Sequence, residues 1–379
     1  MVDQKLEVKK QRISKLFLRE KTDHVPSYFP NGGYLVYYTG HCPNDVQSFE
    51  QAQQITTDGL LDLDPDVGDA YSPNNLWLKP TFDLWGGAMH SISDEGIIQI
   101  VPSAIEIMKP EEYPALIKNP SRYILEEVYP RRYKLLAIEN PEEKYNKIVE
   151  SIAVGFQCFE NCQTEENAGV ISISAGEFIN PVDYIFDFMR SFSGIVRDIR
   201  RTPEYVRDAG LAIADEVLKF TDTLPRESFR ALRCPMHLPP FLKPKDFEKV
   251  YWPSFKKVAD GVAAQGHNIF YLFEKNYMHL HEYLQELPKN KILGLFEEDD
   301  LKTVQKNLGG RMAFAGGITA ELLRFGSRDE CVNQTKYLID TFGGDGNFMV
   351  SPNIPLVSIN DAKPENLKAI YETTKNYGC

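Results

Sequence analysis

The segment Asn268–Glu274, with the sequence NIFYLFE, is the main evidence in this sequence for the fold of the chain. Five consecutive apolar or aromatic residues, Ile269–Phe273, fill it, and the charged Glu274 ends it. A strand that is apolar at every position is typical of a parallel sheet buried on both faces. A carboxylate directly after such a strand either marks the exit into solvent or is functional, because barrel enzymes place their chemistry at the carboxyl ends of their strands.

Six further segments have the composition of strands: 24–30, 169–176, 229–241, 291–297, 311–317 and 347–351. In the last third of the chain these strands alternate with predicted helices, which indicates parallel βαβ units. No GxGxxG or GxxxxGK[ST] phosphate loop is present, so the nucleotide-binding folds lose support. The sequence therefore predicts an α/β fold, a TIM (β/α)8 barrel, rather than an open doubly wound sheet.

Two additions to the barrel are expected. Apolar positions among Lys and Arg predict an N-terminal amphipathic helix over Leu6–Glu20. Residues 62–165 form a long insertion, first an elaborated loop rich in Asp, Pro, Gly and Asn, then a mainly helical part. We expect one barrel domain over residues 1–379 that carries both additions.

Composition excludes several classes of function. The 379 residues are 42% apolar and 25% charged, with a net charge of −12, which argues against a general binder of nucleic-acid backbones. No apolar run is long enough for a transmembrane helix, and the charged N-terminus lacks the apolar core of a signal peptide. Six cysteines do not form a disulfide framework. A cytoplasmic protein with no membrane or nucleic-acid partner is expected.

Candidate catalytic residues stand at the ends of predicted strands. His237, Glu274 and Glu297 each follow a strand, and Asn353, which is a candidate for substrate binding, follows the last one. In a barrel these ends meet on one face. Histidine and carboxylates are ligands of zinc, so these three residues are also candidate metal ligands, although their spacing matches no short motif. Cys234 and His237 are a weaker candidate pair of metal ligands.

Other residues are candidates for substrate binding. Trp85 in the long loop, and Tyr271 and Tyr277 near Glu274, are predicted to line a pocket for a planar ligand, with core packing as the alternative for each. Arg12 in the N-terminal helix is a candidate for gripping an anionic substrate, with a solvated helix face as the alternative.

Three long segments resemble one family: QRISKLFLREKTDHVP (11–26), VPSAIEIMKPEEYPALIKNPSRYILEEVYPRR (101–132) and FLKPKDFEKVYWPSFKKVADGVAAQGH (241–267). The shorter motifs FEKNY, LGGRMAFAGGIT and AKPENLKAI follow. Together they resemble the uroporphyrinogen decarboxylase superfamily, which also contains the corrinoid-linked methyltransferases of anaerobes. The resemblance runs along nearly the whole chain and implies a TIM barrel.

The resemblance transfers to site residues only in part. Arg12 is the one position that is similar to the arginines of the haem-pathway decarboxylase. Where relatives carry a late histidine, this chain has Ser351-Pro352-Asn353. Where the methyltransferases carry a zinc-binding His-x-Cys, it has Phe273-Glu274-Lys275.

The resemblance implies three functions. The first is methyl transfer from a small methylated compound, such as a methoxyaromatic, to a partner corrinoid protein (an anaerobic O-demethylation), with zinc or an acid at the leaving oxygen. The second is decarboxylation of a tetrapyrrole or another carboxylated ring, which requires at least two converging arginines. The third is a barrel that binds a corrinoid or tetrapyrrole without catalysis. A homodimer is compatible with the resemblance.

Overall fold

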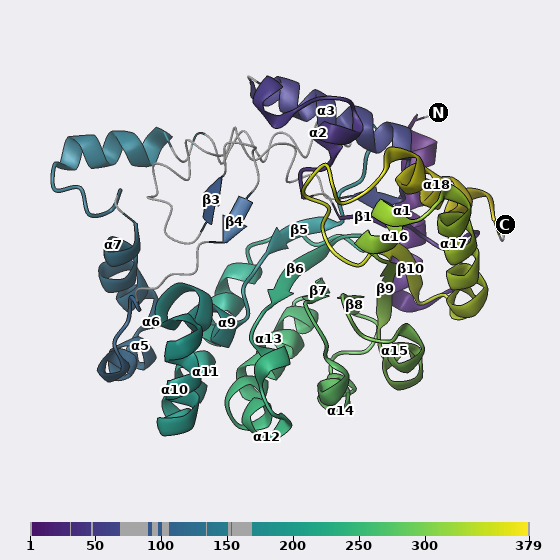
Figure 1. Cartoon of the computed structure of the whole chain (residues 1–379). Helices are drawn as coiled ribbons and strands as arrows, with labels where there is room; N and C mark the ends of the chain where they lie inside the picture. The colour runs from purple at the N-terminus through teal and green to yellow at the C-terminus, as the bar shows by residue number, and fades with distance from the viewer. Residues whose placement is uncertain are drawn as a thin grey trace.

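Parallel strands form the centre of the computed structural model (Figure 1). The structure describes residues 2–30, 32–46, 48–68, 90–92, 98–100, 106–133, 135–150, 153 and 169–377. Six strands form one parallel sheet in the order β10-β9-β8-β7-β6-β5. Their bounds are β5 Ser174–Glu177, β6 Ala231–Met236, β7 Asn268–Phe273, β8 Ile292–Phe296, β9 Ala313–Ile318 and β10 Phe348–Pro352.

Two short strands close this sheet into a barrel. β1 (Tyr28–Phe29) and β2 (Val67–Gly68) pair in parallel with each other. A bridge between Ser27 and Val350 joins β1 to β10, and a bridge between Gly68 and Ser172 joins β2 to the residues before β5. The chain therefore forms the predicted (β/α)8 barrel. A separate antiparallel pair, β3 (His90–Ile92) and β4 (Ile98–Ile100), lies in the insertion.

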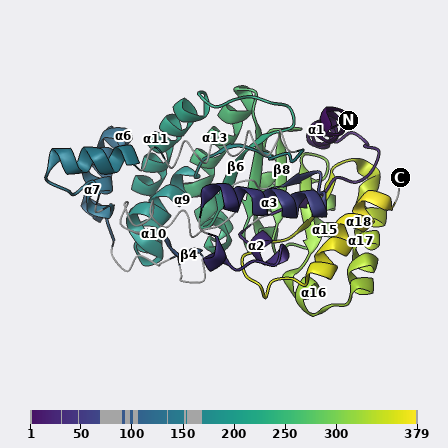
Figure 2. The same ribbon diagram turned by 90° about the horizontal axis from the view of Figure 1, so that it is seen from above.

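Helices surround the strands. Figure 2 shows α9, α11 and α13 on one side of the strands, and α15, α17 and α18 on the other. The longer helices are α1 Val2–Leu18, α3 Phe49–Leu63, α10 Ser191–Arg201, α11 Pro203–Thr221, α13 Trp252–Ala264, α15 Leu301–Leu308, α17 Arg328–Phe342 and α18 Pro364–Asn376. The shorter ones are α2 Leu35–Tyr38, α5 Tyr113–Lys118, α6 Pro120–Tyr123, α7 Tyr129–Arg132, α9 Pro181–Ile185, α12 Pro244–Asp246, α14 His281–Leu284 and α16 Ala320–Phe325. Residues 141–150 are also helical.

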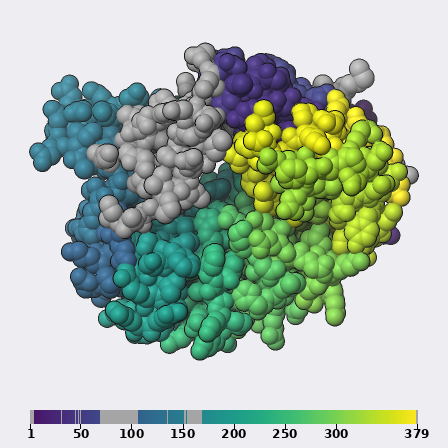
Figure 3. Space-filling view, in the orientation of Figure 1, coloured from purple at the N-terminus to yellow at the C-terminus, as the bar shows by residue number. Residues whose placement is uncertain are grey.

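Three helical stretches have π geometry: η3 Ile124–Val128, η4 Phe186–Arg190 and η6 Phe247–Tyr251. Short 3-10 turns complete the set: η1 Pro43–Asp45, η2 Pro110–Glu112, η5 Pro239–Phe241, η7 Met278–Leu280 and η8 Gly343–Asp345. The C-terminal segment packs beside the N-terminal one (Figure 3). No helix within the described ranges is long and apolar enough to span a membrane.

Alternate residues of each strand enter different apolar layers. In β7, Phe270 and Leu272 pack inside the barrel, whereas Ile269, Tyr271 and Phe273 pack against the helices outside. Both layers are buried, which explains why the strand is apolar at every position. This alternation decides which side chains after each strand face the barrel mouth.

The N-terminal helix α1 covers the amino ends of the strands. Ile13, Leu16 and Phe17 are buried among the side chains inside the barrel. Arg19, just after the helix, donates to the carbonyl of Gly309 and to Asn290, which precede β9 and β8. The helix therefore closes the end of the barrel opposite the mouth.

The second barrel strand lies where no strand was predicted. Val67–Gly68 falls inside segment 62–165, so the insertion between barrel strands begins only after Gly68. A two-residue strand within DPDVGDA has no period to detect. Ser48 caps the next helix back along the chain, α3, and accepts a hydrogen bond from the N–H of Gln51 at 3.2 Å. Trp85 lies outside the described residues.

Candidate active site at the carboxyl end of the barrel

Four predicted site residues stand in equivalent positions at the mouth. His237, Glu274, Glu297 and Asn353 each follow the last residue of a strand, namely β6, β7, β8 and β10. In β7 and β8 the interior residues Leu272 and Leu295 have the same parity as Glu274 and Glu297. These side chains therefore start from the inner register of the barrel wall.

A cavity of about 230 Å³ opens at this end. Its lining residues come from the ends of β7, β8 and β10: Leu272, Phe273, Glu274, Leu295, Glu297, Asn353, Ile354 and Pro355. It joins an apolar floor to a rim with two carboxylates. This composition suits a small, partly apolar ligand.

His237 is held by carboxylates on both sides of its ring. Its Nδ1 lies 2.6 Å from Oδ2 of Asp187, and its Nε2 lies 3.4 Å from Oε1 of Glu274. Asp187 is 8% exposed, whereas Glu274 is 48% exposed. The buried carboxylate fixes the ring, and Nε2 points to the open side of the site.

Asp183 fixes the backbone that carries this histidine. Its carboxylate accepts the N–H of Leu238 at 2.9 Å and the N–H of His237 at 3.3 Å. The hydroxyl of Tyr251 donates to it at 2.6 Å. Burial is the largest influence on the Asp183 carboxyl and raises its pKa. Asp183 is therefore a positioning residue beneath His237.

The imidazole carries the positive charge of this cluster. Burial by itself lowers the pKa of His237, but the hydrogen bonds to Asp187 and Glu274 outweigh it and raise the pKa to about 11. Within the described ranges no lysine or arginine forms an ion pair with Asp183, Asp187 or Glu274. His237 is thus an imidazolium that can donate a proton from Nε2.

Glu297 holds the turn that presents Glu274. Its Oε2 accepts the N–H of Lys275 at 2.7 Å, and its Oε1 lies 3.3 Å from the Lys275 ammonium. Lys275 has a φ of 66°, in the left-handed region that non-glycine residues rarely adopt. The hydrogen bond from Glu297 therefore stabilises the strained backbone of Lys275, next to Glu274.

Asn353 forms hydrogen bonds with the backbone at the ends of two neighbouring strands. Its Oδ1 accepts the N–H of Gly317 at 2.6 Å, and its Nδ2 donates to the carbonyl of Glu297 at 3.0 Å. Both ends of the amide are therefore used within the barrel wall. It lines the cavity, but its polar atoms point to backbone rather than offering the predicted substrate contact.

Tyr271 and Tyr277 do not line the mouth. Tyr271 packs edge-on against Phe255 of α13, in the layer outside the barrel. Tyr277 is 1% exposed, and its hydroxyl donates to the carbonyl of Met236 at 2.9 Å. Because β7 is buried on both faces, its sequence does not reveal which residues point inward. For these two the alternative of core packing holds.

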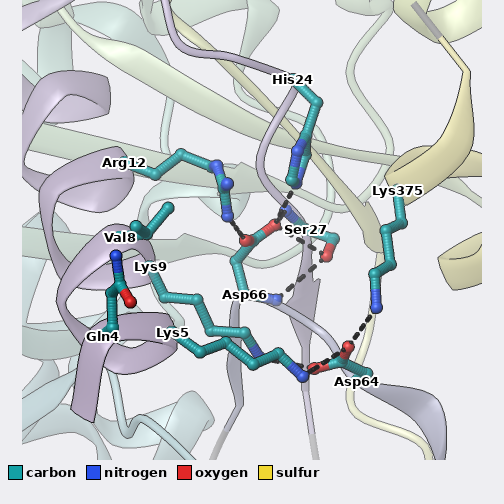
Figure 4. A pocket seen from close by; sticks show the side chains of 10 residues that line it. All are labelled: Gln4, Lys5, Val8, Lys9, Arg12, His24, Ser27, Asp64, Asp66 and Lys375. Carbon is teal, nitrogen blue, oxygen red and sulfur yellow. Dashed lines mark hydrogen bonds and ion pairs between the residues drawn. The ribbon is translucent and has the colours of Figure 1, made fainter. Parts of the chain in front are cut away.

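Arg12 lies at the opposite end of the barrel. Its guanidinium bonds Asp23 and also Asp66, which directly precedes β2. Figure 4 shows Arg12 beside Asp66. Arg12 is 6% exposed in this cluster. The position that is similar to a family arginine therefore belongs to a helix beneath the barrel, and Arg12 does not reach the mouth.

The residues at the mouth fit a zinc ion incompletely. A catalytic zinc needs three protein ligands. His237 and Glu274 face each other, but the Glu297 carboxylate is engaged by Lys275, and the described residues contain no group of three that could hold a metal. We therefore derive no catalytic step through zinc, and the metal set His237, Glu274 and Glu297 stays a prediction.

Asp183 and Asp187 escaped the sequence analysis. They follow β5 and stand four residues apart, in α9 and η4, on one helix face. Acids four apart after a strand are the signal that would have found them. Asp187 also lies in a π-helical turn, a feature that often marks functional sites, but it is visible only in the structure.

Comparisons with known proteins agree with this architecture. A methyltransferase from Methanosarcina mazei has a similar structure, with a TM-score of 0.60 and 13% sequence identity, over 98% of this chain and 99% of that one. At that identity the likeness shows the fold. No curated protein matches the sequence significantly. The model of the uroporphyrinogen decarboxylase (URO-D) family matches residues 180–377, which include β6 to β10 and all four residues of the mouth. The chain therefore belongs to the uroporphyrinogen decarboxylase family.

Proposed function

We propose that this protein is a methyltransferase that takes a methyl group from a small methyl ether, with a methoxyaromatic compound as the preferred class. The observation that carries the proposal is the His237 imidazolium, fixed through Nδ1 by buried Asp187 and directed through Nε2 toward the half-exposed Glu274. A fixed cation with one N–H toward an open site is suited to donate a proton to a leaving oxygen.

The pKa of the proton donor is close to that of this leaving group. A phenol has a pKa of about 10, and the pKa of His237 is raised to about 11. As the methyl–oxygen bond breaks, Nε2 gives its proton to the oxygen, and the product leaves as a neutral phenol. Glu274 moves aside from Nε2 when the ether oxygen binds. Asp187 holds the ring throughout, and solvent returns the proton.

The methyl group needs an acceptor. A reduced corrinoid on a partner protein would supply the nucleophile that accepts it. An exposed aromatic pair beside the His237 loop fits a flat apolar partner: Phe192 and Phe241 meet edge-on at 5.3 Å and are 47% and 58% exposed. Phe241 lies in η5, four residues after His237. This pair is the proposed contact surface for the partner.

The proposal is tested by cob(I)alamin methylation over a panel of methoxyaromatic compounds. Wild-type protein should methylate cob(I)alamin with at least one of them, and His237→Gln should lower the activity by about 10²- to 10⁴-fold. His279→Gln is the matched control, because His279 is exposed and, within the described residues, its ring bonds only the carbonyl of Leu242. No activity across the panel in the wild type, with or without added zinc, would contradict the proposal.

One observation favours decarboxylation as a second candidate. Arg233 of β6 has the same parity as Ala231, which packs inside the barrel, so an arginine faces the interior below the mouth. A carboxylated ring would need such a cation. Apart from His237 and Lys275, the charged residues that the structure describes at the mouth are acids, and Arg12 is at the other end. Carbon dioxide release from a carboxylated ring that is lost in Arg233→Gln but retained in His237→Gln would favour this candidate.

A further inference from the structure

The helical segment that carries Asp187 is broken shortly after it. The π-helical stretch η4 ends at Arg190, and the next residue, Ser191, has φ 60° and ψ 171°, a conformation that residues other than glycine rarely adopt. A helix that ends leaves the carbonyls of its last turn without partners inside the helix. These carbonyls include those of residues 187–189, so their partners decide how firmly Asp187 is held.

Arg132 of α7 donates to two of these carbonyls. Its Nη1 lies 3.0 Å from the carbonyl oxygen of Phe188 and 3.4 Å from that of Asp187. The central carbon of the guanidinium lies 4.4 Å from the centroid of the Phe188 ring, a cation–π contact. Arg132 is 6% exposed, so water competes little for these contacts. One side chain thus binds both the backbone and a ring of η4.

A second segment, just before η2, holds the same turn from its other side. The N–H groups of residues 107 and 108 both donate to the carbonyl of Met189 at 3.0 Å. Arg190 is completely buried and lies 2.6 Å from Asp198 and 2.9 Å from Glu106. Residues 106–132, which lie between β2 and β5 in the sequence, therefore fix η4 on two sides.

We propose that Arg132 is a positioning residue, which keeps the Asp187 carboxylate against Nδ1 of His237 by holding the end of η4. The inference rests on the proposed function, in which His237 gives the proton. Nδ1 lies 2.6 Å from Oδ2 of Asp187, and a hydrogen bond of this length weakens steeply when its partners shift or rotate. Glu274, on the other side of the ring, comes from the end of β7, so the loss of Arg132 should affect Nδ1 first.

Proton NMR of the full chain, at one fixed pH and without substrate or corrinoid, tests the proposal. The readout is the low-field Nδ1–H resonance of His237, identified by its absence in His237→Gln, and the rate at which this proton exchanges with water. The variants are Arg132→Gln and Arg132→Lys, since lysine keeps the charge but lacks the planar fork. Arg122→Gln is the matched control, because Arg122 lies in α6, is 71% exposed and pairs with Glu126. The backbone N–H of Ile269 in β7 reports on the barrel itself.

The wild type and Arg122→Gln should show a slowly exchanging resonance. In Arg132→Gln its exchange should be about tenfold faster, the usual effect of losing one hydrogen bond to a charged group, while exchange at Ile269 stays unchanged. Arg132→Lys should give an intermediate rate, and it decides the test if the glutamine variant does not fold.

Three results would overturn the proposal: wild-type exchange in both Arg132 variants, an equally large rise at Ile269, or no such resonance in the wild type. The first means that Asp187 is held without Arg132, and the second means that Arg132 supports only the fold. Absence of methyl transfer in a wild type that shows the resonance would contradict the proposed function instead, so the two failures are distinguishable.

Discussion

Each end of the barrel holds a histidine between two carboxylates, but only one of these clusters is set up for proton transfer. At the mouth His237 lies between Asp187 and Glu274. At the amino end His24 lies between Asp23 and Asp66. The same residue types therefore occur twice, and their chemistry depends on what else neutralises the carboxylates.

Arg12 makes the difference at the amino end. It pairs with both Asp23 and Asp66, so those carboxylates have a permanent cation. Its hydrogen bond lowers the pKa of Asp23 to about 2. At the mouth, within the described ranges, His237 is the only cationic partner of Asp187 and Glu274. We infer that a histidine beside carboxylates acts as a proton donor where no arginine neutralises those carboxylates.

The largest expected effect is the loss of turnover at the mouth. His237→Gln keeps a similar shape but has no transferable proton, so methylation of cob(I)alamin should fall by about 10²- to 10⁴-fold. Asp187→Asn should cause a smaller fall and lower the pKa seen in the pH profile of kcat. Retention of wild-type turnover in His237→Gln would place the chemistry elsewhere.

The second effect is on stability at the amino end. Arg12 and Asp66 are 6% and 4% exposed, and removal of one partner from a buried ion pair costs about 3–5 kcal/mol. Arg12→Gln should lower the free energy of unfolding by that amount in urea titrations. A loss below about 1 kcal/mol, as is typical of surface pairs, would mean that the pair is solvated.

The third effect is on the pH dependence of stability. The folded pKa of His237, about 11, lies above its unfolded value, so its contribution is present below about pH 6.5 and is lost as pH rises toward 11. Asp23 acts in the opposite direction, because its contribution is lost as pH falls below about 4 toward 2.

His237→Gln should therefore flatten the alkaline arm of the stability curve, by on the order of 2–3 kcal/mol, and leave the acid arm intact. Arg12→Gln should flatten the acid arm. Thermal unfolding from pH 3 to pH 10 measures both arms. An alkaline arm that is unchanged in His237→Gln would show that the imidazole is not held as a cation.

The smallest effect concerns the turn beside Glu274. Lys275→Gly removes the left-handed strain at φ 66°, and Lys275→Ala keeps it, so glycine should be the more stable by about 1 kcal/mol. Glu297→Gln weakens the hydrogen bond to the N–H of Lys275 in the same turn, and it should reduce turnover by less than His237→Gln does. Equal stability of the two Lys275 variants would mean that the backbone at residue 275 is not strained.

The strand pattern predicted the barrel and three residues of the candidate site at its mouth. Strands apolar at every position, such as Asn268–Phe273, carry a strong signal, and His237, Glu274 and Glu297 follow such strands directly. The same feature concealed the direction of Tyr271, because a strand buried on both faces does not show which residues point inward. Asp187 lies in η4 and does not directly follow a strand, so the strand pattern did not single it out.

Arg12 shows a different limit. Its sequence position is similar to that of a family arginine, but the packing of Ile13 and Leu16 beneath the barrel turns the helix so that Arg12 meets Asp66. That contact joins residues 54 positions apart, and no local pattern contains it. Local periodicity thus predicts elements and strand ends, whereas charge pairing between distant segments appears only in the structure.

The most direct test of the central claim is an NMR titration of the histidine side chains, with the His237 signal identified by its absence in His237→Gln. The account predicts that the ring stays doubly protonated at pH 9 and loses its proton only as the pH approaches about 11. Loss of the proton between pH 6 and pH 7, the range of an unperturbed histidine, would contradict a cationic proton donor at the mouth.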